Sequence, residues 1–470
     1  MRSFPREAVD ASKRAVRLSD LAARYTDLRP AGGGALLGLC PLHEERTPSF
    51  RVDDERGQFK CFGCGKAGDH LDLLQERERL SFPEAVRELA RVGGVDLPHD
   101  DGGPGVVAPD GPAERRRRAL AFAGRFYHGQ LAQSQAGAPA RVYLRRRGFA
   151  PPVLRRFGVG YAPRQGEARA ARLAASPTPL AAAAALEGVA LEDLVAAGLV
   201  RESRRAGGGY YEVFRGRIVF PVLDPVRGHV LGFAGRRLDR AGSAQDDRCP
   251  KYVNTSEECG YDKREALFGL HQARRSAFGS GQAVLVEGYA DVLALHQAGV
   301  TSAVAAGGTA FTAEQAAALR RLGERVLVVY DADAGGLAGA VDAVRTALAA
   351  GLRARVATLP EGEDPASYLA AAAEVADAQT ALEARATDAV TYVYEAVRAG
   401  RETVEGHLDA VRAVVRAIEG VVDPLTREAY LQRTAEVSGM RPGAVEAALG
   451  WGAAAEPALV PAPVPAPVPA

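Results

Sequence analysis

The pattern of hydrophobic and polar positions is clearest between residues 282 and 364. Four short apolar runs occur there, AVLVEG, SAVAAG, RVLVVYDAD and RARVATLP, and alanine-rich helical stretches separate them. Apolar strands that alternate with helices are typical of a parallel sheet covered on both faces. This part of the chain therefore predicts a parallel α/β domain.

The flanking parts of the chain have other patterns. From residue 115 to about residue 262, arginine-rich helical stretches are mixed with two strand-like runs, RIVFPVLD and HVLGFAGRRL, on either side of a turn at 225–228. This arrangement predicts a β-hairpin edged by basic residues. From about residue 370 to residue 449 the periodicity is helical, and the pattern predicts no strand.

Glycine and proline mark the predicted domain boundaries. Residues 98–113, PHDDGGPGVVAPDGPA, are too rich in both for a helix or a strand and predict a flexible linker. Because 470 residues exceed the size at which one hydrophobic core keeps growing, we expect several domains. The predicted parts of this α/β multidomain chain are a small N-terminal β domain (1–97), the linker (98–113), an α+β basic part (114–270), the parallel α/β domain (280–368), a C-terminal helical subdomain (369–450) and a Pro/Ala-rich tail (451–470).

Composition and charge limit the class of protein. The chain has no N-terminal signal segment and no run of about 18 apolar residues, so we expect a cytoplasmic protein without a membrane partner. Its net charge is only +1, and any nucleic-acid surface must therefore be local. Arginine clusters at 115–118, 145–147, 204–205 and 236–237 could neutralise phosphates, although each cluster alone is more easily explained as a solvated face.

Two pairs of candidate zinc ligands lie near the N-terminus. Cys40 and His43 form C-P-L-H, and Cys61 and Cys64 form C-F-G-C after 17 intervening residues. A spacing of two residues lets a tight turn aim both side chains at one ion, and thiolate with imidazole suits tetrahedral Zn²⁺. Since all four positions are protein, we predict one structural zinc. The weaker alternative is that these cysteines are small buried hydrophobes.

Carboxylates follow two of the apolar runs. Glu287 ends the first run, Asp291 comes four residues later, and Asp331 and Asp333 end another run before two glycines. Ligands of open parallel sheets bind beyond the carboxyl ends of the strands, so these groups should converge on one crevice. Repelling carboxylates need a cation, and hard oxygen ligands favour Mg²⁺. A single D-x-D would more simply be a helix cap or a solvated strand end.

The string around the zinc ligands, GLCPLHEERTPSFRVDDERGQFKCFGCGKAGDHLDLL, resembles the zinc-binding domain of bacterial replicative primases. The resemblance implies a small zinc-ribbon β domain that contacts template DNA and helps to choose where synthesis begins. Arg46, Lys60 and Lys66 would contact phosphates. Phe59 and Phe62 would either stack on bases or pack against the metal core.

The order E-G-x-x-D, then Gly307-Gly308-Thr309, then D-x-D-x-x-G resembles the Toprim fold, which primases share with type IA and II topoisomerases and some nucleases. The resemblance implies that Glu287, Asp331 and Asp333 are the catalytic, metal-binding carboxylates. It makes Asp291 a supporting magnesium ligand and places Gly308 and Thr309 along the cleft.

A third acidic element, LPEGEDPASYL, matches the primase pattern at Asp364, which the resemblance adds to the magnesium ligands. The sequence departs from the pattern at Ala366, where primases commonly carry a second aspartate. The departure leaves the number of catalytic metals open, and Glu361 or Glu363 could compensate for it.

The segments YLRRRG with FGVGYAP, FRGRIVFPVLDPVRGHVLGFAGRRLD and CPKYVNTSE resemble the N-terminal part of the primase polymerase core. By this resemblance Asn254 and Ser256 match polar positions of the primase polymerase core. Without it, Arg236 or Lys251 would be interpreted as ordinary surface charges. The cationic positions that would hold template phosphates and nucleoside triphosphates are Arg147, Arg215, Arg217, Arg236, Lys251 and Lys263.

Together the resemblances imply a DNA primase, a DNA-directed RNA polymerase that uses Mg²⁺ or Mn²⁺ and one structural Zn²⁺. Its partners would be single-stranded DNA, ribonucleoside triphosphates and the RNA primer, and we expect a monomer at the replisome in the nucleoid. Bacterial primases usually end in a further helical domain that docks on the replicative helicase, and we expect this sequence to lack it. Either the helicase contact is lost or moved, or the chain is truncated, so that partner stays open.

Two alternatives compete with a primase. One is a different Toprim enzyme, a topoisomerase or nuclease that cuts phosphodiester bonds at the same carboxylates. A topoisomerase would need a further large domain with a nucleophilic tyrosine, and only about 100 residues follow Asp364. A DNA-binding accessory protein with a silent active site is the alternative from another class, and Ala366 motivates it. The sequence has no G-x-x-x-x-G-K-[ST] motif, so a fused helicase motor is not expected.

Overall fold

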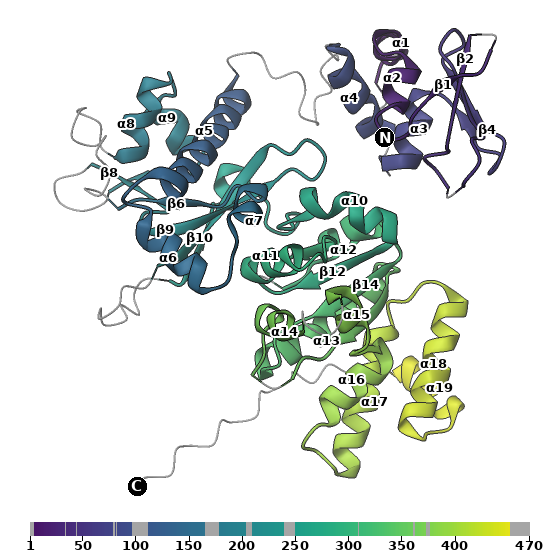
Figure 1. The fold of residues 1–470 in the computed structure, drawn as a ribbon. Coiled ribbons are helices and arrows are strands. Elements are labelled where there is room, and N and C mark those ends of the chain that lie inside the picture. The colour runs from purple at the N-terminus through teal and green to yellow at the C-terminus, as the bar shows by residue number, and fades with distance from the viewer. Residues whose placement is uncertain are drawn as a thin grey trace. The chain divides into compact units, whose positions relative to one another are not determined.

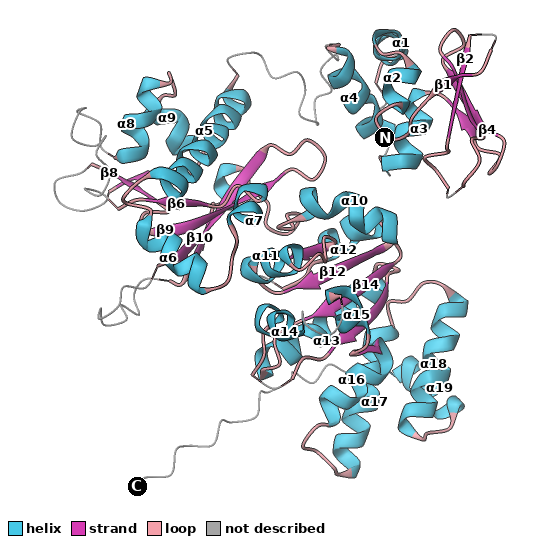
Figure 2. Ribbon diagram, in the orientation of Figure 1, coloured by secondary structure: helices cyan, strands magenta, loops and turns pink. Residues whose placement is uncertain are grey.

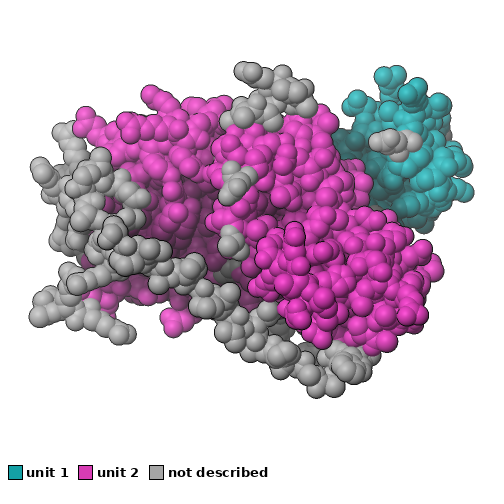
Figure 3. Space-filling view, turned by 90° about the horizontal axis from the view of Figure 1, so that it is seen from below, with its two compact units in different colours: residues 1–115 teal, residues 116–470 magenta. Residues whose placement is uncertain are grey.

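The computed structural model describes residues 4–95, 111–164, 178–203, 209–238, 250–372 and 377–451, apart from the single residues 33, 44, 79, 81, 309 and 361. The chain divides into two compact units, residues 1–115 and 116–470, which Figure 3 distinguishes by colour. Most of the predicted linker and nearly all of the predicted tail lie outside the described residues. The linker prediction extends to residue 113, whereas the next helix begins at Pro112.

The N-terminal unit contains a five-stranded antiparallel sheet and four helices (Figures 1 and 2). Alternate residues of its middle strands, such as Phe50 and Val52, are buried, which is the period expected of a half-buried strand. In sheet order the strands are β1 (Arg29–Pro30), β2 (Ala35–Gly38), β3 (Phe50–Asp53), β4 (Gln58–Cys61) and β5 (Ala67–Gly68). The helices are α1 (Arg6–Ala15), α2 (Leu18–Ala22), α3 (His70–Glu78) and α4 (Phe82–Gly93).

The first part of the second unit is built on an antiparallel sheet. The predicted hairpin is confirmed, because β9 (Arg217–Leu223) pairs antiparallel with β10 (Val230–Arg237). The sheet also has β6 (Gly160–Ala162) beside β9 and β11 (Tyr252–Asn254) beside β10, and β7 (Val200–Glu202) pairs with β8 (Tyr210–Glu212) elsewhere. The helices of this part are α5 (Pro112–Gln133), α6 (Ala138–Arg146), α7 (Pro151–Arg156), α8 (Pro179–Leu186) and α9 (Leu191–Ala196), and the short η2 (Glu257–Cys259) follows β11.

The predicted parallel sheet is confirmed as well. Its order is β13 (Ala303–Ala305), β12 (Gln282–Val286), β14 (Arg325–Val329), β15 (Arg353–Ala357) and β16 (Ala386–Asp388), and all neighbours except the last pair are parallel. The connecting helices are α10 (Leu270–Ser280), α11 (Tyr289–Gln297), α12 (Ala313–Arg320), α13 (Ala334–Ala349), α14 (Pro365–Ala372) and α15 (Ala378–Glu383).

The prediction that residues 370–449 contain no strand was wrong at β16 (Ala386–Asp388). This strand adds to the edge of the sheet, antiparallel to β15. It has only three residues, which is too short for a periodic pattern to appear in the sequence. The remainder of the region is helical, with α16 (Ala389–Arg398), α17 (Val404–Ile418), α18 (Pro424–Ser438) and α19 (Pro442–Trp451).

The parallel sheet separates two hydrophobic cores. Alternate residues of β12 take part in each, since Ala283 and Leu285 pack with α10, α13 and α17, whereas Val284 and Val286 pack with α11. The second core also contains Ile218 of β9, so the basic part and the parallel domain share apolar packing. Among the described helices, none is long and apolar enough to cross a membrane.

Candidate metal centres and nucleic-acid interface

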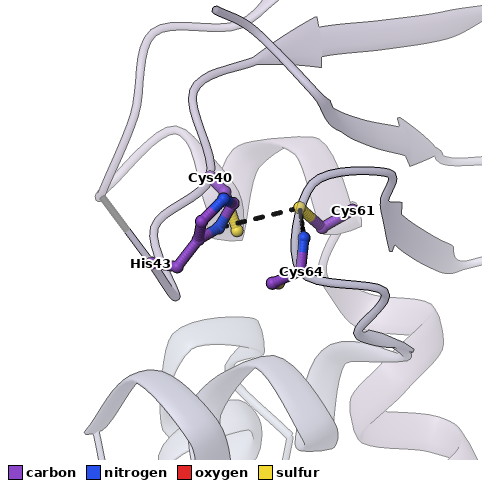
Figure 4. A group of neighbouring side chains, drawn as sticks. All are labelled: Cys40, His43, Cys61 and Cys64. Atoms are coloured by element: carbon purple, nitrogen blue, oxygen red, sulfur yellow. Dashed lines mark hydrogen bonds between the residues drawn. The ribbon is translucent and has the colours of Figure 1, made fainter. Parts of the chain in front are cut away.

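The four predicted zinc ligands come together in the N-terminal unit. One ligand atom from each of Cys40, His43, Cys61 and Cys64 lies within 4.8 Å of the others (Figure 4). Each ligand pair lies in a tight turn, in which the Leu42 N–H donates to Cys40 Sγ at 3.4 Å and the Cys64 N–H donates to Cys61 Sγ at 3.3 Å. The donor set and its spacing fit one tetrahedral Zn²⁺.

Glu45 contacts Cys40, His43 and Ser49 at this centre. It was not among the residues predicted from the sequence. Its carboxylate accepts the Cys40 N–H at 2.6 Å and the Ser49 hydroxyl at 2.5 Å. It also lies 3.3 Å from His43 Nε2, while His43 Nδ1 lies 3.8 Å from Cys61 Sγ. A carboxylate behind a metal-binding imidazole fixes the tautomer and the orientation of the ring. The only sequence signal was an acidic residue between the two ligand pairs.

Gly63, the second of the two residues between Cys61 and Cys64, has no room for a side chain. A Cβ on Gly63 would lie 2.8 Å from His43 Nε2 and 2.9 Å from Glu45 Oε2. Glycine is therefore needed here for close approach, because no real Cβ contact is so short.

The thiols of the centre have opposite pKa shifts. Burial raises the pKa of Cys40 to about 12. Burial also disfavours the Cys61 thiolate, but hydrogen bonds from Ser49 and the Cys64 backbone outweigh it and lower the pKa of Cys61 to about 7. A thiol like Cys40 binds zinc only after losing its proton, so zinc binding releases protons here.

The two phenylalanines of the zinc domain have different environments. Phe59 is 2% exposed, and its ring centroid lies 5.1 Å from that of Phe50, so it packs in the core. Phe62 is 64% exposed on the second knuckle, and the Lys60 ammonium lies 5.3 Å from its ring centroid. Of the two, only Phe62 is available to stack on a base.

The predicted carboxylates converge at one edge of the parallel sheet. Glu287 follows β12 and Asp331 follows β14, and Val286 pairs with Val329 in this parallel ladder. The Asp331 N–H lies 3.4 Å from Glu287 Oε1. Neighbouring strands thus place both carboxylates at their carboxyl ends, as the sequence predicted.

The helices that follow these strands hold the other two carboxylates. Asp291, on α11, accepts the Gly288 N–H at 3.0 Å, and Asp333 caps α13 by accepting the Gly336 N–H at 2.8 Å. A Cβ on Gly336 would lie 2.2 Å from the Asp331 carbonyl oxygen and 2.8 Å from Glu287 Oε1, so the start of α13 can approach the cluster only because residue 336 is glycine.

Burial and mutual repulsion raise the pKa values of this cluster. Burial and the Asp331 charge raise the pKa of Glu287. Burial, Asp364 and Asp333 raise the pKa of Asp331. Burial, with Asp331 and Asp364, raises the pKa of Asp291 to about 7. Among the described residues, Asp331 Oδ1 is buried without a hydrogen-bond partner. Crowded carboxylates with a buried, unsatisfied oxygen fit a divalent cation.

The third acidic element lies beside this cluster. Asp364 Oδ1 accepts the Ser367 N–H at 2.7 Å, so the carboxylate caps α14, and Asp364 Oδ2 lies 3.6 Å from Arg147 Nη2. Of the two glutamates considered as substitutes for a second aspartate, Glu363 has a buried Oε2 without a hydrogen-bond partner in the described part of the chain. Glu361 lies outside the described residues, as does Thr309.

Three of the predicted cationic positions lie close to the acidic site. Arg147 pairs with Asp364, and the Lys251 charge lowers the pKa of Asp331 against the effect of burial. The Arg236 guanidinium lies 4.8 Å from the Tyr143 ring centroid. Burial raises the pKa of Tyr252, and the charges of Arg236 and Arg147 partly offset this effect.

Of the other three cationic positions, Arg215 and Arg217 donate to backbone carbonyls. The Arg215 guanidinium donates to the Glu212 carbonyl at 2.8 Å and lies over the Tyr211 ring. Arg217 is 4% exposed and donates to the Pro250 carbonyl at 3.0 Å. Lys263 lies at a loop where its own carbonyl accepts Gln315 Nε2 at 3.1 Å.

Tyr289 connects the basic part to the acidic site and was also missed. Its hydroxyl donates to the Gly307 carbonyl at 2.9 Å and lies 3.2 Å from Asn254 Oδ1. Of the two predicted polar residues, Asn254 thus lies beside Tyr289. The other, Ser256, lies directly before η2. Cys259 is partly buried and unpaired, and Cys249 lies outside the described residues.

Comparison with protein-family models gives three matches along the chain. The CHC2 zinc finger matches residues 4–103, the N-terminal domain of the DNA primase catalytic core matches 126–274, and the Toprim-like model matches 284–369.

Individual proteins agree with these models. The DNA primase of Deinococcus radiodurans is 37% identical over 440 residues, which are 92% of this chain and 70% of that protein. The structure of the zinc-binding and RNA polymerase domains of Aquifex aeolicus primase is 29% identical and has a TM-score of 0.58, with 95% of this chain and 99% of that chain covered. A primase catalytic domain bound to single-stranded DNA is 28% identical, with a TM-score of 0.56 over 71% of this chain and 99% of that one.

The fold and the acidic site define a zinc-ribbon protein with a Toprim catalytic core. With relatives as similar as the Deinococcus protein, the chain belongs to the bacterial DNA primases, the nucleotidyltransferases that synthesise RNA primers for DNA replication. The CHC2 match and the Cys/His cluster make its zinc a structural one, and the Toprim core indicates a divalent metal.

Proposed function

We propose that Glu287, Asp331 and Asp333, with Asp291 in support, hold Mg²⁺ or Mn²⁺ and carry out primer synthesis on a single-stranded DNA template. In this reaction the 3′-hydroxyl of one nucleotide attacks the α-phosphate of an incoming ribonucleoside triphosphate, and pyrophosphate leaves. The observation that carries the proposal is the convergence of these carboxylates around the buried, unsatisfied Asp331 Oδ1.

The metal, when bound, would lower the pKa of the attacking hydroxyl and neutralise charge on the transferred phosphoryl group. Asp331 and Asp333 would orient it, because Asp331 lies two residues after the end of β14 and Asp333 is fixed as the cap of α13. Glu287 is the candidate to accept the proton of the hydroxyl, since burial and the Asp331 charge raise its pKa toward the range in which a carboxylate is an effective base.

The cationic side chains would bind phosphates. Arg147, Arg236 and Lys251 belong to the basic part, and their electrostatic effects on Tyr252 and Asp331 support a position near the acidic cluster. Phosphate contacts fix the register of a strand without reading its sequence. The contacts of Arg215 and Arg217 support a role in holding the sheet from which the other cations project.

Template recognition would be shared with the zinc domain. The catalytic domain of a similar primase has been solved with single-stranded DNA, which supports the same partner for residues 116–470. In the zinc domain, exposed Phe62 with Lys60 offers a stacking surface beside a positive charge. We propose that the protein acts as a monomer in the cytoplasm, at the replication fork.

The test is primer synthesis by Asp331→Asn on single-stranded DNA with labelled ribonucleotides. We expect a loss of at least about a hundredfold, because the substitution removes charge from the metal site without changing shape, while zinc content and circular dichroism stay unchanged. Asp342→Asn is the matched control, since Asp342 is an exposed residue of α13 that pairs with Arg345. Full activity of Asp331→Asn would contradict the assignment.

A further inference from the structure

The first part of the second unit contains a long run of arginines that no acidic residue interrupts. Residues 115–166 contain twelve arginines and no aspartate, glutamate or lysine, although the whole chain has a net charge of only +1. Some of these arginines have partners in the protein. Arg125 and Arg147 pair with carboxylates, and Arg141 donates to two backbone carbonyls. Contacts of this kind account for only part of the charge.

Two arginines of this run lie on α7, on the side away from the core. α7 packs against α11 (Figure 1), and the ring of Phe157, which ends α7, lies edge-on to the buried His296 ring of α11 with 4.8 Å between the ring centroids. Arg155 and Arg156 are exposed, and Arg156 Nη2 donates to the Gln272 carbonyl of α10 at 3.4 Å. The exposed side of α7 is therefore cationic and adjoins α10.

A third arginine joins these two from α10. Gln272 and Arg275 lie three positions apart and therefore on the same side of the helix, so the Gln272 contact brings Arg156 within about one helical turn of the exposed Arg275. Residues 266–286, which include α10, have no acidic residue either. Among the described residues, no carboxylate pairs with Arg155, Arg156 or Arg275. These three residues form what we call the arginine surface.

Stabilisation of the two helices does not account for the arginine surface. The helix dipole favours cations in a last turn, but α7 has only six residues and Arg275 lies in the middle of α10. Exposed arginines elsewhere have acidic partners, as Arg345 has in Asp342 at 3.0 Å. Neighbouring cations without such a partner repel one another, and an external polyanion would remove this repulsion.

We propose that the arginine surface binds the sugar–phosphate backbone of nucleic acid, outside the acidic site. Guanidinium groups match phosphates in charge and geometry. Contacts with phosphates hold a strand whatever its sequence, which suits a strand that moves as it is copied. The proposal rests on the primer synthesis proposed above for the identity of this strand, which is the single-stranded template or the RNA–DNA duplex that primer synthesis produces.

The experiment measures the affinity of the full chain for fluorescent single-stranded DNA and for an RNA–DNA duplex, by anisotropy between about 50 and 200 mM salt. The test variant combines Arg155→Gln, Arg156→Gln and Arg275→Gln. The matched control combines Arg125→Gln, Arg345→Gln and Arg412→Gln, which removes the same net charge from exposed arginines that pair with carboxylates. A second test variant, Arg155→Gln with Arg275→Gln, keeps the Arg156 contact with α10 in case the triple variant does not fold.

We expect the triple variant to reduce the slope of log affinity against log salt concentration by about 2 for the single strand or about 3 for the duplex, since each lost phosphate contact reduces it by about 0.7 or 0.9. The double variant should show about two thirds of this change, and the control should behave as the wild type. The kcat of primer synthesis at saturating template should stay unchanged, because the acidic cluster is intact. A change with the single strand alone would identify the template as the ligand, and a change with the duplex would identify the product.

Wild-type affinity and salt dependence of the test variants for both nucleic acids would overturn the proposal and leave an acidic protein surface as the partner that these arginines fit. Failure of the proposed function has a different signature, because the binding measurement needs no nucleotides. It would appear as wild-type protein that binds single-stranded DNA and makes no RNA.

Discussion

At the scale of single residues, Glu45 links the two halves of the zinc centre. Its carboxylate contacts the Cys40 backbone, the Ser49 hydroxyl and the His43 ring, and Ser49 Oγ in turn lies 3.2 Å from Cys61 Sγ. Loss of this group should leave His43 free to rotate and the first knuckle without its acceptor.

We predict that Glu45→Ala lowers zinc affinity about 10- to 100-fold, the range typical for partners of metal-binding histidines. Competition with a chromogenic chelator measures the affinity directly. The matched control is Glu76→Ala, which removes an exposed ion pair with Lys66 in the same domain. Equal zinc release from Glu45→Ala and the wild type would show that Glu45 has no such role.

Glu212 is a buried acid that should make folding depend on pH. It is 2% exposed, and burial raises its pKa to about 7 although the Leu180 N–H and Thr178 stabilise its ionised form. The unfolded chain ionises near its usual value of 4.5. The stabilising effect of the protonated carboxyl is therefore complete below that pH and is lost as the pH rises through 7, at a cost of about 3 kcal/mol.

Glu212→Gln should remove this dependence, because an amide does not ionise. Urea unfolding of the full chain at pH 5 and pH 8 should show that the variant gains stability relative to the wild type as the pH rises. Glu187→Gln, an exposed residue that pairs with Arg125, should behave as the wild type at both values. A parallel pH profile for Glu212→Gln and the wild type would contradict the pKa assignment.

The positions of the candidate metal ligands could be predicted from the sequence, because ligand identity and spacing are local. The four zinc ligands and the carboxylates after β12 and β14 lie where the motifs placed them. Residues that act through a partner far along the chain could not be predicted. The Gln297 side chain accepts a hydrogen bond from the Ala150 N–H, 147 positions away in the sequence, and no periodicity in the sequence predicts such a contact.

At the scale of elements, the longer strands were predicted and most of the short ones were not. The β9–β10 hairpin and the parallel strands β12, β14 and β15 are long enough for their burial to show in the sequence, and β13, although it has three residues, lies in the longer apolar run SAVAAG. By contrast, β6, β11 and β16 have three residues each. Their pairing depends on the neighbouring strand, which supplies the hydrogen bonds, and such tertiary effects override weak local preference.

The helical subdomain should be stabilised through α17. Ile418, at its end, is fully buried against the parallel domain, whereas Val422 in the following loop is 87% exposed. We predict that Ile418→Ala lowers the free energy of unfolding by about 2 to 5 kcal/mol, since it leaves a cavity in the core. Val422→Ala should change it by less than about 0.5 kcal/mol, and chemical denaturation of both variants measures the difference. Equal stability of the two would contradict the packing of α17.

At the scale of the whole molecule, two compact units should respond separately to metal removal. The zinc ligands all lie in residues 1–115, and the acidic cluster lies in residues 116–470. Because a structural zinc contributes its binding energy to folding, its removal should unfold only the unit that holds it.

Calorimetry of the full chain with and without a zinc chelator tests this. We expect the transition of the smaller unit to shift to lower temperature or disappear while the transition of the larger unit stays in place. Primer initiation should suffer, and the folded catalytic unit should persist. A shift of both transitions together would mean that the two units fold as one.

The most direct test of primer synthesis is an assay of the wild-type protein on single-stranded DNA without any added primer. We predict short RNA products that contain labelled ribonucleotide, are destroyed by alkali and require a divalent cation. Binding of the single-stranded DNA without any RNA product, under conditions in which a known primase is active, would contradict this account and indicate a DNA-binding protein with a silent acidic site.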